Sequence, residues 1–186
     1  LAAMPIAHAQ HGGSSPLPAF TAPPEAREFD FLIGHWEIEL TPKVSGMVAL
    51  VHGAPRLVGS WKAWPAFDGF GIEDELRVID ASGNPTTLNH ALRMYDGNKG
   101  QWLISGLDVY RALTSQASGR WQDGEMHVNG AGTHRDGTRY LSRTRFFEIT
   151  QDSFRMQQDR STDGGDTWEE AAIAIAARRV AAVAPR

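Results

Sequence analysis

The sequence predicts an all-β protein, an antiparallel up-and-down β-barrel of about eight to ten strands preceded by a short N-terminal helix or turn. Segments that alternate apolar and polar residues follow one another from His35 onward, which is the period of a strand with one buried face. Breaks such as Asp123-Gly124 and Asp136-Gly137 separate them, as in hairpins. So many strands in succession favour a closed barrel over an open sheet with two exposed edges.

The first residues are similar to the end of a secretory signal peptide. Leu1–Gln10 is apolar and alanine-rich, and Ala7-His8-Ala9 has the Ala-x-Ala form of a signal-peptidase site. We therefore expect a periplasmic or secreted protein, and the alternative is an extension without a targeting role. The following Gly/Ser/Pro-rich stretch predicts a flexible arm, so residues 1–27 are interpreted as signal remnant and arm.

The predicted barrel occupies residues 28–180, and residues 181–186 form a tail. The predicted strands are His35–Leu40, Met47–His52, Leu57–Trp64, Gly71–Ile79, Thr86–Tyr95, Gln101–Ala112, Glu125–Thr133, Arg139–Ile149, Ser153–Arg160 and Thr167–Ala176. The last of them is rich in Ala and Ile, and it either closes the barrel or pairs with a second copy in a homodimer.

The most informative segment is Phe29–Glu39, a helical or turn stretch that runs into a strand. Gly34 permits a sharp backbone turn, and Trp36 and Ile38 then share one face of the strand. A large indole at the first inward position predicts a plug at the floor of the barrel.

This Phe-Asp-Phe-Leu-Ile-Gly-His-Trp motif resembles the opening of lipocalin-like proteins of the calycin type, especially a widespread bacterial group with an FDFxxGxW motif. Arg93-Met94-Tyr95-Asp96 with Trp102, and Ser161–Trp168, are also similar to that group. The resemblance covers roughly residues 28 to 178 and implies a lipocalin-like barrel. Related heme-binding barrels show Gly-x-Trp-x-Gly-x-Gly, whereas Glu37-Ile38-Glu39 follows Trp36 here, so no heme and no other cofactor is expected.

The segment Ser161–Trp168 also matches the Asp-box hairpin of sialidase-type propellers. A propeller repeats its blade, and this chain contains one copy of the motif. We therefore interpret it as a structural turn rather than as part of a glycosidase.

Composition excludes several classes of function. The 186 residues carry 18 basic and 22 acidic side chains, a formal net charge of −4, so no nucleic-acid partner is expected. No apolar run has membrane-spanning length, so an integral membrane protein is not expected. The sequence has no cysteine, no zinc-protease helix motif, no hydrolase nucleophile elbow and no phosphate-binding glycine loop.

Strand alternation predicts a cavity with an apolar floor and a polar mouth, the arrangement that orients a small ligand. On three strands an apolar face continues into polar residues: Leu88, Leu92 and Met94 with His90; Trp102, Ile104 and Gly106 with Asp108 and Tyr110; and Phe154 and Met156 with Gln158 and Arg160. Trp61 and Trp64 are three residues apart, so at most one of them lines the barrel.

The first hypothesis is that the barrel binds a small, mostly apolar organic molecule. Its expected contacts are Trp36, Trp61, His90, Tyr110, Gln158 and Arg160. The alternative is a cofactor-free lyase or isomerase in which His90 is the base, Asp108 orients it and Tyr110 stabilises an oxyanion. These polar groups could equally form a buried structural network.

Two further side-chain patterns bear on ligand chemistry. Arg143 and Arg145 alternate with Ser142 and Thr144, so either the arginines or the hydroxyls face inward, and inward arginines favour a carboxylate-bearing ligand. His127 and His134 have opposite strand parity. No metal site is expected.

Overall fold

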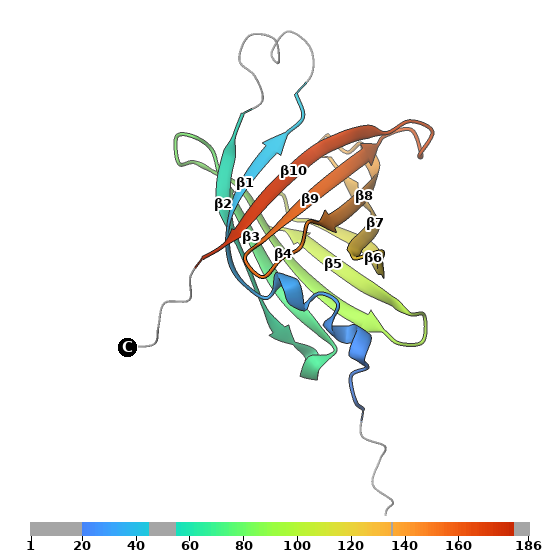
Figure 1. Ribbon diagram of the computed structural model, residues 1–186. Helices are drawn as coiled ribbons and strands as arrows, with labels where there is room; N and C mark the ends of the chain where they lie inside the picture. Colours follow the sequence, from blue (N-terminus) through green and yellow to red (C-terminus); the bar gives the residue numbers. More distant parts are fainter. Residues whose placement is uncertain (1–19, 45–54, 135, 181–186) are drawn as a thin grey trace, which may run out of the picture.

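The computed structural model describes residues 20–44, 55–134 and 136–180. Within them ten antiparallel strands form a closed barrel in which each strand pairs with the next (Figure 1). The strands are β1 (Gly34–Pro42), β2 (Leu57–Ala66), β3 (Gly71–Ile79), β4 (Pro85–Asp96), β5 (Gln101–Asp108), β6 (Leu113–Gln122), β7 (Glu125–Thr133), β8 (Arg139–Phe147), β9 (Ser153–Ser161) and β10 (Glu169–Arg179). The predicted lipocalin-like fold class is confirmed.

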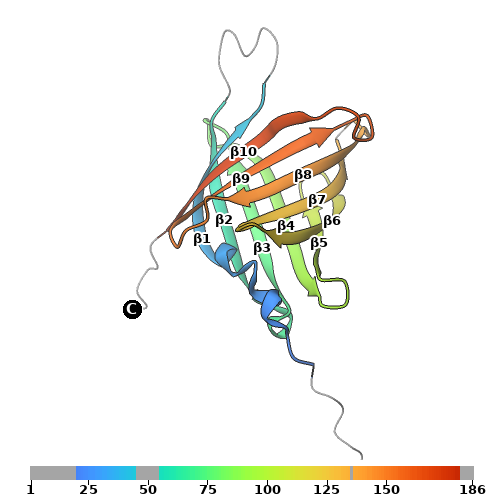
Figure 2. The same ribbon diagram turned by 45° about the vertical axis from the view of Figure 1, so that its right-hand side comes forward.

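The strand β10 closes the barrel by pairing with β1 (Figure 2). Trp36 lies opposite Arg179, and Ile38 lies opposite Ala177. Of the two alternatives for the final strand, closure within one chain is the one the structure adopts.

One strand was not predicted, and one predicted strand is not described. The missed strand is β6, whose inward residues include Ser115, Ala117 and Gly119 and therefore give no apolar alternation. Three segments lie outside the described residues: the predicted strand Met47–His52, residues 1–19 with the signal-like Leu1–Gln10, and the tail 181–186.

Two 3-10 turns, η1 (Pro24–Arg27) and η2 (Asp30–Leu32), lie across one end of the barrel (Figure 1), and a third, η3 (Phe67–Gly69), joins β2 to β3. The η1 turn falls in the segment predicted as an arm, yet its Ala26 is buried. The carboxylate of the following Glu28 accepts a hydrogen bond from Trp102 Nε1 at 3.0 Å. This hydrogen bond ties the N-terminal segment to β5, and η1 also contacts β4.

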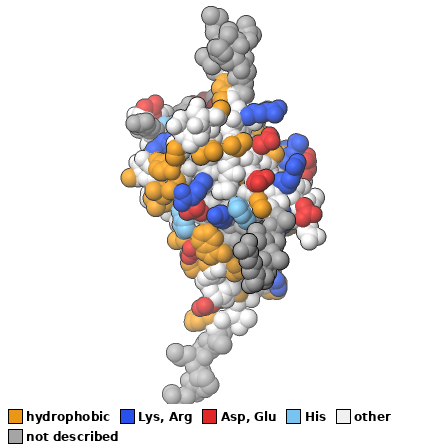
Figure 3. Space-filling view, turned by 90° about the vertical axis from the view of Figure 1, so that its left-hand side faces the viewer, with side chains coloured by type: hydrophobic (Ala, Val, Ile, Leu, Met, Phe, Trp, Pro, Cys, Tyr) orange, Lys and Arg blue, Asp and Glu red, His pale blue; other side chains and the backbone are white. Residues whose placement is uncertain are grey.

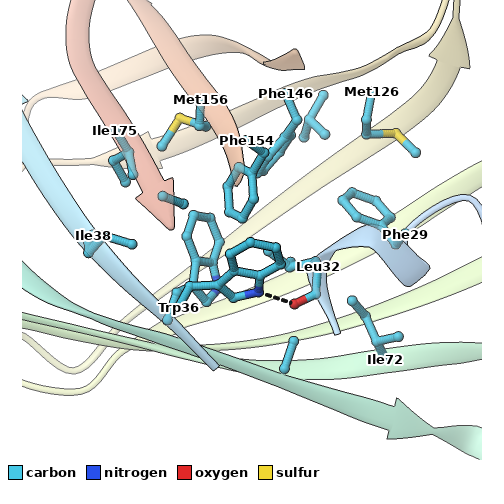
Figure 4. Close-up of a cluster of buried hydrophobic side chains, with 14 of the residues drawn as sticks. Phe29, Leu32, Trp36, Ile38, Ile72, Met126, Phe146, Phe154, Met156 and Ile175 are labelled. Carbon is cyan, nitrogen blue, oxygen red and sulfur yellow. Dashed lines mark hydrogen bonds between the residues drawn. The ribbon is translucent and has the colours of Figure 1, made fainter. Parts of the chain in front are cut away.

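Buried aromatic residues fill this end of the barrel (Figure 4). Trp36 is fully buried, its Nε1 donates to the Leu32 carbonyl at 2.7 Å, and Phe154 packs edge-on against it at 4.9 Å between ring centres. Gly34 reaches this geometry with a φ of +132°, a backbone conformation that other residues rarely adopt. The predicted plug is confirmed, and Trp36 seals the barrel together with Phe29 and Leu32.

The Asp-box segment between β9 and β10 is a braced turn. Asp163 accepts hydrogen bonds from the Thr167 hydroxyl and amide and from the Ser161 hydroxyl. The Ser161 hydroxyl also accepts the Gly165 amide at 2.8 Å, and Trp168 Nε1 donates to the Gly165 carbonyl at 3.0 Å. This turn fixes the end of β9 beside Arg160.

Acid should weaken this turn. The hydrogen bonds from Thr167 and Ser161 lower the pKa of Asp163 well below its usual range, so the folded state holds the ionised form. The stabilisation is therefore complete above the unfolded-state pKa of about 4 and is lost as the pH falls toward the folded pKa. We expect Asp163→Asn to lower the urea midpoint at neutral pH, with the difference from wild type narrowing below about pH 4.

The matched control is Asp166→Asn in the same turn, because Asp166 makes no side-chain hydrogen bond within the described residues. Its urea midpoint should follow wild type across the pH series. A constant difference between Asp163→Asn and wild type down to pH 2 would contradict the assignment.

Candidate functional site

The barrel encloses a cavity of about 610 Å³ on the side of the core away from η1 and η2. Its apolar lining includes Leu40, Leu76, Ile104, Val128, Met156 and Ile175. Polar side chains also line it, among them Asn89, Asp108, His134, Tyr140, Gln158 and Arg160. Several of these polar residues lie where strands end, at Asp108 of β5, Tyr140 of β8 and Arg160 of β9, so they form the mouth.

A buried ion pair lies in the cavity wall close to the aromatic core. Asp74 and Arg93 are 2% and 7% exposed, and Arg93 Nε donates to Asp74 Oδ2 at 2.5 Å. Trp61 Nε1 donates to the other carboxylate oxygen at 2.8 Å. The Arg93 guanidinium also lies 4.8 Å from the centre of the Phe29 ring. Both charges are therefore compensated, and the pair joins β2, β3 and β4.

Sequence reasoning missed this pair, although β3 carries a signal for half of it. Ile72, Leu76 and Val78 alternate along β3, and Asp74 shares their face. A carboxylate on an otherwise apolar face needs a buried partner. No comparable signal identifies Arg93, because the exposed Leu92 and Met94 beside it suggest the opposite orientation of β4.

At the mouth, Arg160 is held by neutral partners. Its Nε donates to Gln158 Oε1 at 2.9 Å, and Gln158 Nε2 donates to the Thr144 hydroxyl at 3.1 Å. The guanidinium carbon lies 4.8 Å from the centre of the Tyr140 ring. The predicted inward orientation of Gln158 and Arg160 is confirmed, while their contact with a ligand stays a prediction.

Tyr140 and His134 are mouth residues that sequence reasoning did not select. Their rings lie 4.6 Å apart, and Tyr140 lies over Gly132, where an added Cβ would stand 2.4 Å from the Tyr140 hydroxyl oxygen. The available signal was that Tyr140 shares the strand face of Ser142 and Thr144. Glycine at position 132 thus makes room for the tyrosine ring.

Asp108 faces the cavity as predicted, but its carboxylate is engaged locally. It accepts hydrogen bonds from the Arg111 guanidinium at 2.7 Å and from the Arg111 amide at 3.2 Å. The strand ends at Asp108, so Tyr110 lies in the following turn, is 50% exposed and is not among the cavity-lining residues.

The predicted inward face of β4 is wrong. Leu92 and Met94 are exposed on the outside, whereas Asn89, Ala91 and Arg93 face inward. The reason is the buried ion pair, which requires Arg93 inside and therefore turns every second residue of β4 outward.

His90 is affected by this inversion. It borders the cavity, but its ring lies on the outer face, with Nε2 3.6 Å from Glu73 Oε2 and the ring centre 6.0 Å from that of Trp64. The structure therefore does not bring His90, Asp108 and Tyr110 to one point.

The remaining predicted orientations are settled by the register. Trp61 faces the cavity and Trp64 faces outward, as the spacing required. Trp36 seals the barrel and is not among the lining residues. Arg143 and Arg145 face outward, over the rings of Trp168 and Phe147 at 3.7 and 4.2 Å. The hydroxyls of Ser142 and Thr144 line the cavity instead.

A second hollow, of about 830 Å³, lies on the outer surface across β1, β2, β9 and β10. Charged side chains such as Glu37, Arg77 and Arg155 border it. Hydrophobic side chains on the face in Figure 3 also lie in small groups separated by charged and histidine side chains. A ligand there would stay largely in water, so the interior cavity is the better candidate site.

Within residues 20–44, 55–134 and 136–180, no group of three or more His, Cys, Asp or Glu side chains is placed to hold a metal ion. In the same part of the chain, no helix is long and apolar enough to span a bilayer.

Comparison with solved structures supports the fold. The crystal structure of Rv2717c from M. tuberculosis matches with a TM-score of 0.61 and 11% sequence identity, covering 86% of this chain and 99% of that one. The structure of EF1p2_mFAP2b bound to DFHBI matches at a TM-score of 0.44 and 9% identity, covering 84% of this chain and 99% of that one. No protein-family model and no curated protein matches the sequence. The first of these two matches shows a similarity in fold, at a sequence identity too low to transfer a function.

Proposed function

We propose that the protein binds a small, mostly apolar organic molecule in the central cavity of its barrel. The observation that carries the proposal is the cavity of about 610 Å³, enclosed by strands, sealed at one end by Trp36 and Phe29 and lined by polar groups at the other. Pockets for small ligands typically measure about 300–1,000 Å³ and combine an apolar lining with a few polar groups.

Mass spectrometry of the protein purified from its source cells under mild conditions tests the proposal. A stoichiometric small molecule released on denaturation is the expected result. Its absence, with no uptake of added apolar compounds, would contradict cavity binding.

Filling the cavity should weaken binding. Ala91 faces the cavity on β4, opposite Gly106 of β5. Ala91→Phe places a ring in the space that a ligand needs, so we expect calorimetric titration with diphenylamine to show binding weakened by about tenfold or more.

The control is Leu92→Phe, the next residue, which points outward and is 38% exposed. This variant should bind diphenylamine like wild type. Equal binding by wild type and by a folded Ala91→Phe would place the bound molecule outside the cavity and reject the proposed site.

Three further predictions remain part of the proposal. Export is supported by the Ala7-His8-Ala9 motif, and subcellular fractionation tests it. Relationship to the bacterial FDFxxGxW group is supported by Phe29–Trp36. A homodimer is tested by sedimentation, and it would not form by strand pairing through β10, because β10 is already paired with β1 and β9.

A further inference from the structure

Arg160 differs from the other charged side chains that line the cavity. Arg93 pairs with Asp74, and Arg111 pairs with Asp108 at 2.7 Å. No carboxylate of the described residues lies within 4.0 Å of the Arg160 guanidinium, although Glu169 is its neighbour across the β9–β10 ladder. Because each of these two ion pairs is neutral as a whole, the guanidinium of Arg160 gives the mouth a net positive charge.

The Arg160 side chain is already oriented for binding. Its Nε donates to Gln158, which is itself fixed by Thr144, and its guanidinium carbon lies over the Tyr140 ring. The two terminal amino groups have no hydrogen-bond acceptor among the described residues. They form a fork of parallel N–H donors, the geometry that a carboxylate accepts with two hydrogen bonds.

From this arrangement we infer that the cavity ligand carries a carboxylate, which binds the terminal fork of Arg160 while its apolar body lies against Ile104, Val128 and Met156. The inference rests on the proposed function, because it names the chemical class of the molecule bound in that cavity. One guanidinium balances one carboxylate charge. The other two guanidinium groups of the lining are already engaged, so a doubly charged phosphate would remain half compensated.

A matched pair of compounds tests the inference. Diphenylamine and N-phenylanthranilic acid share one apolar skeleton, and only the second carries a carboxylate. Calorimetric titration of wild type at neutral pH is expected to show the acid bound roughly 10- to 100-fold more tightly, as for a charge-assisted bidentate contact.

Substitutions then assign the preference to Arg160. Arg160→Gln should bind both compounds with similar affinity, and Arg160→Lys, which keeps the charge without the fork, should retain part of the preference. The control is Arg155→Gln on the same strand, because Arg155 faces outward and pairs with Glu148 at 3.1 Å. That variant should prefer the acid as strongly as wild type. Circular dichroism of each variant verifies that the barrel is folded.

The outcomes separate the inference from the proposed function. If wild type binds both compounds equally, or if the preference survives in Arg160→Gln, the carboxylate inference is overturned and cavity binding stands. If wild type binds neither compound, cavity binding fails and the inference fails with it. A preference that is lost in Arg160→Gln and kept in Arg155→Gln supports both.

Discussion

Asp74→Asn is expected to lower the free energy of unfolding by about 3–5 kcal/mol, because it leaves a buried guanidinium without its partner charge. The variant keeps the size of the side chain and removes its charge. Arg93 would then remain buried, at 7% exposure, without an anion within reach. Because a protein of this size is typically stable by about 5–15 kcal/mol, the loss is a large part of the total.

The electrostatic origin of this effect is tested by a double-mutant cycle. Among the described residues, Arg93→Met alone leaves the carboxylate of Asp74 with the Trp61 donor at 2.8 Å and no other, so it should also be strongly destabilising. The double variant removes both charges and should lose less than the sum of the single losses. The measurement is unfolding in guanidinium chloride followed by tryptophan fluorescence.

The control for the cycle is an exposed ion pair beside the buried one. Glu75 and Arg77 are joined at 2.7 Å on the outer face of β3, and the Arg77 hydrogen bond lowers the pKa of Glu75. Glu75→Gln should cost less than about 1 kcal/mol, because water screens a surface pair. A loss below about 1 kcal/mol for Asp74→Asn as well, or strict additivity in the double variant, would contradict the buried-pair assignment.

Prediction of the inward face from the sequence succeeded on β9 and failed on β4, where the buried Asp74–Arg93 pair decides the orientation. On β9, Phe154 and Met156 face inward, so the apolar pattern correctly placed Gln158 and Arg160 on the cavity side. On β4 the pattern is inverted, since the exposed Leu92 and Met94 lie outside while Arg93 points inward. Alternation shows which residues share a face, and only tertiary pairing shows which face is buried.

The cavity itself weakens the sequence signal. A strand that borders open space needs small or polar inward residues, such as Ser115 and Ala117 of β6, and such a strand lacks apolar alternation. The mouth residues Tyr140 and His134 come from β8 and the loop before it, and their contact depends on Gly132 of β7. No single strand pattern contains that information.

The second large effect is expected at the sealed end of the barrel. Trp36→Ala removes a fully buried indole that packs against Phe154 at 4.9 Å and lies under the Arg179 guanidinium at 4.0 Å. Large-to-small substitutions of this kind cost about 3–5 kcal/mol, because neighbouring groups fill the space only in part. Urea unfolding followed by far-ultraviolet circular dichroism measures the loss without depending on the missing tryptophan.

Trp36→Phe separates packing from hydrogen bonding at this position. It keeps an aromatic ring but leaves the Leu32 carbonyl, which accepts Trp36 Nε1 at 2.7 Å, without its donor. We expect Trp36→Phe to lower the free energy of unfolding by about 1–3 kcal/mol, which is less than the loss expected for Trp36→Ala. This loss has two causes, the unpaired buried carbonyl and the smaller ring.

Trp64→Ala is the control, because that indole is 39% exposed on the outer face and its removal should cost far less. If Trp36→Ala were no more destabilising than Trp64→Ala, Trp36 could not be the plug of the barrel. The cavity would then need another seal, because a ligand site with two open ends would exclude water much less effectively.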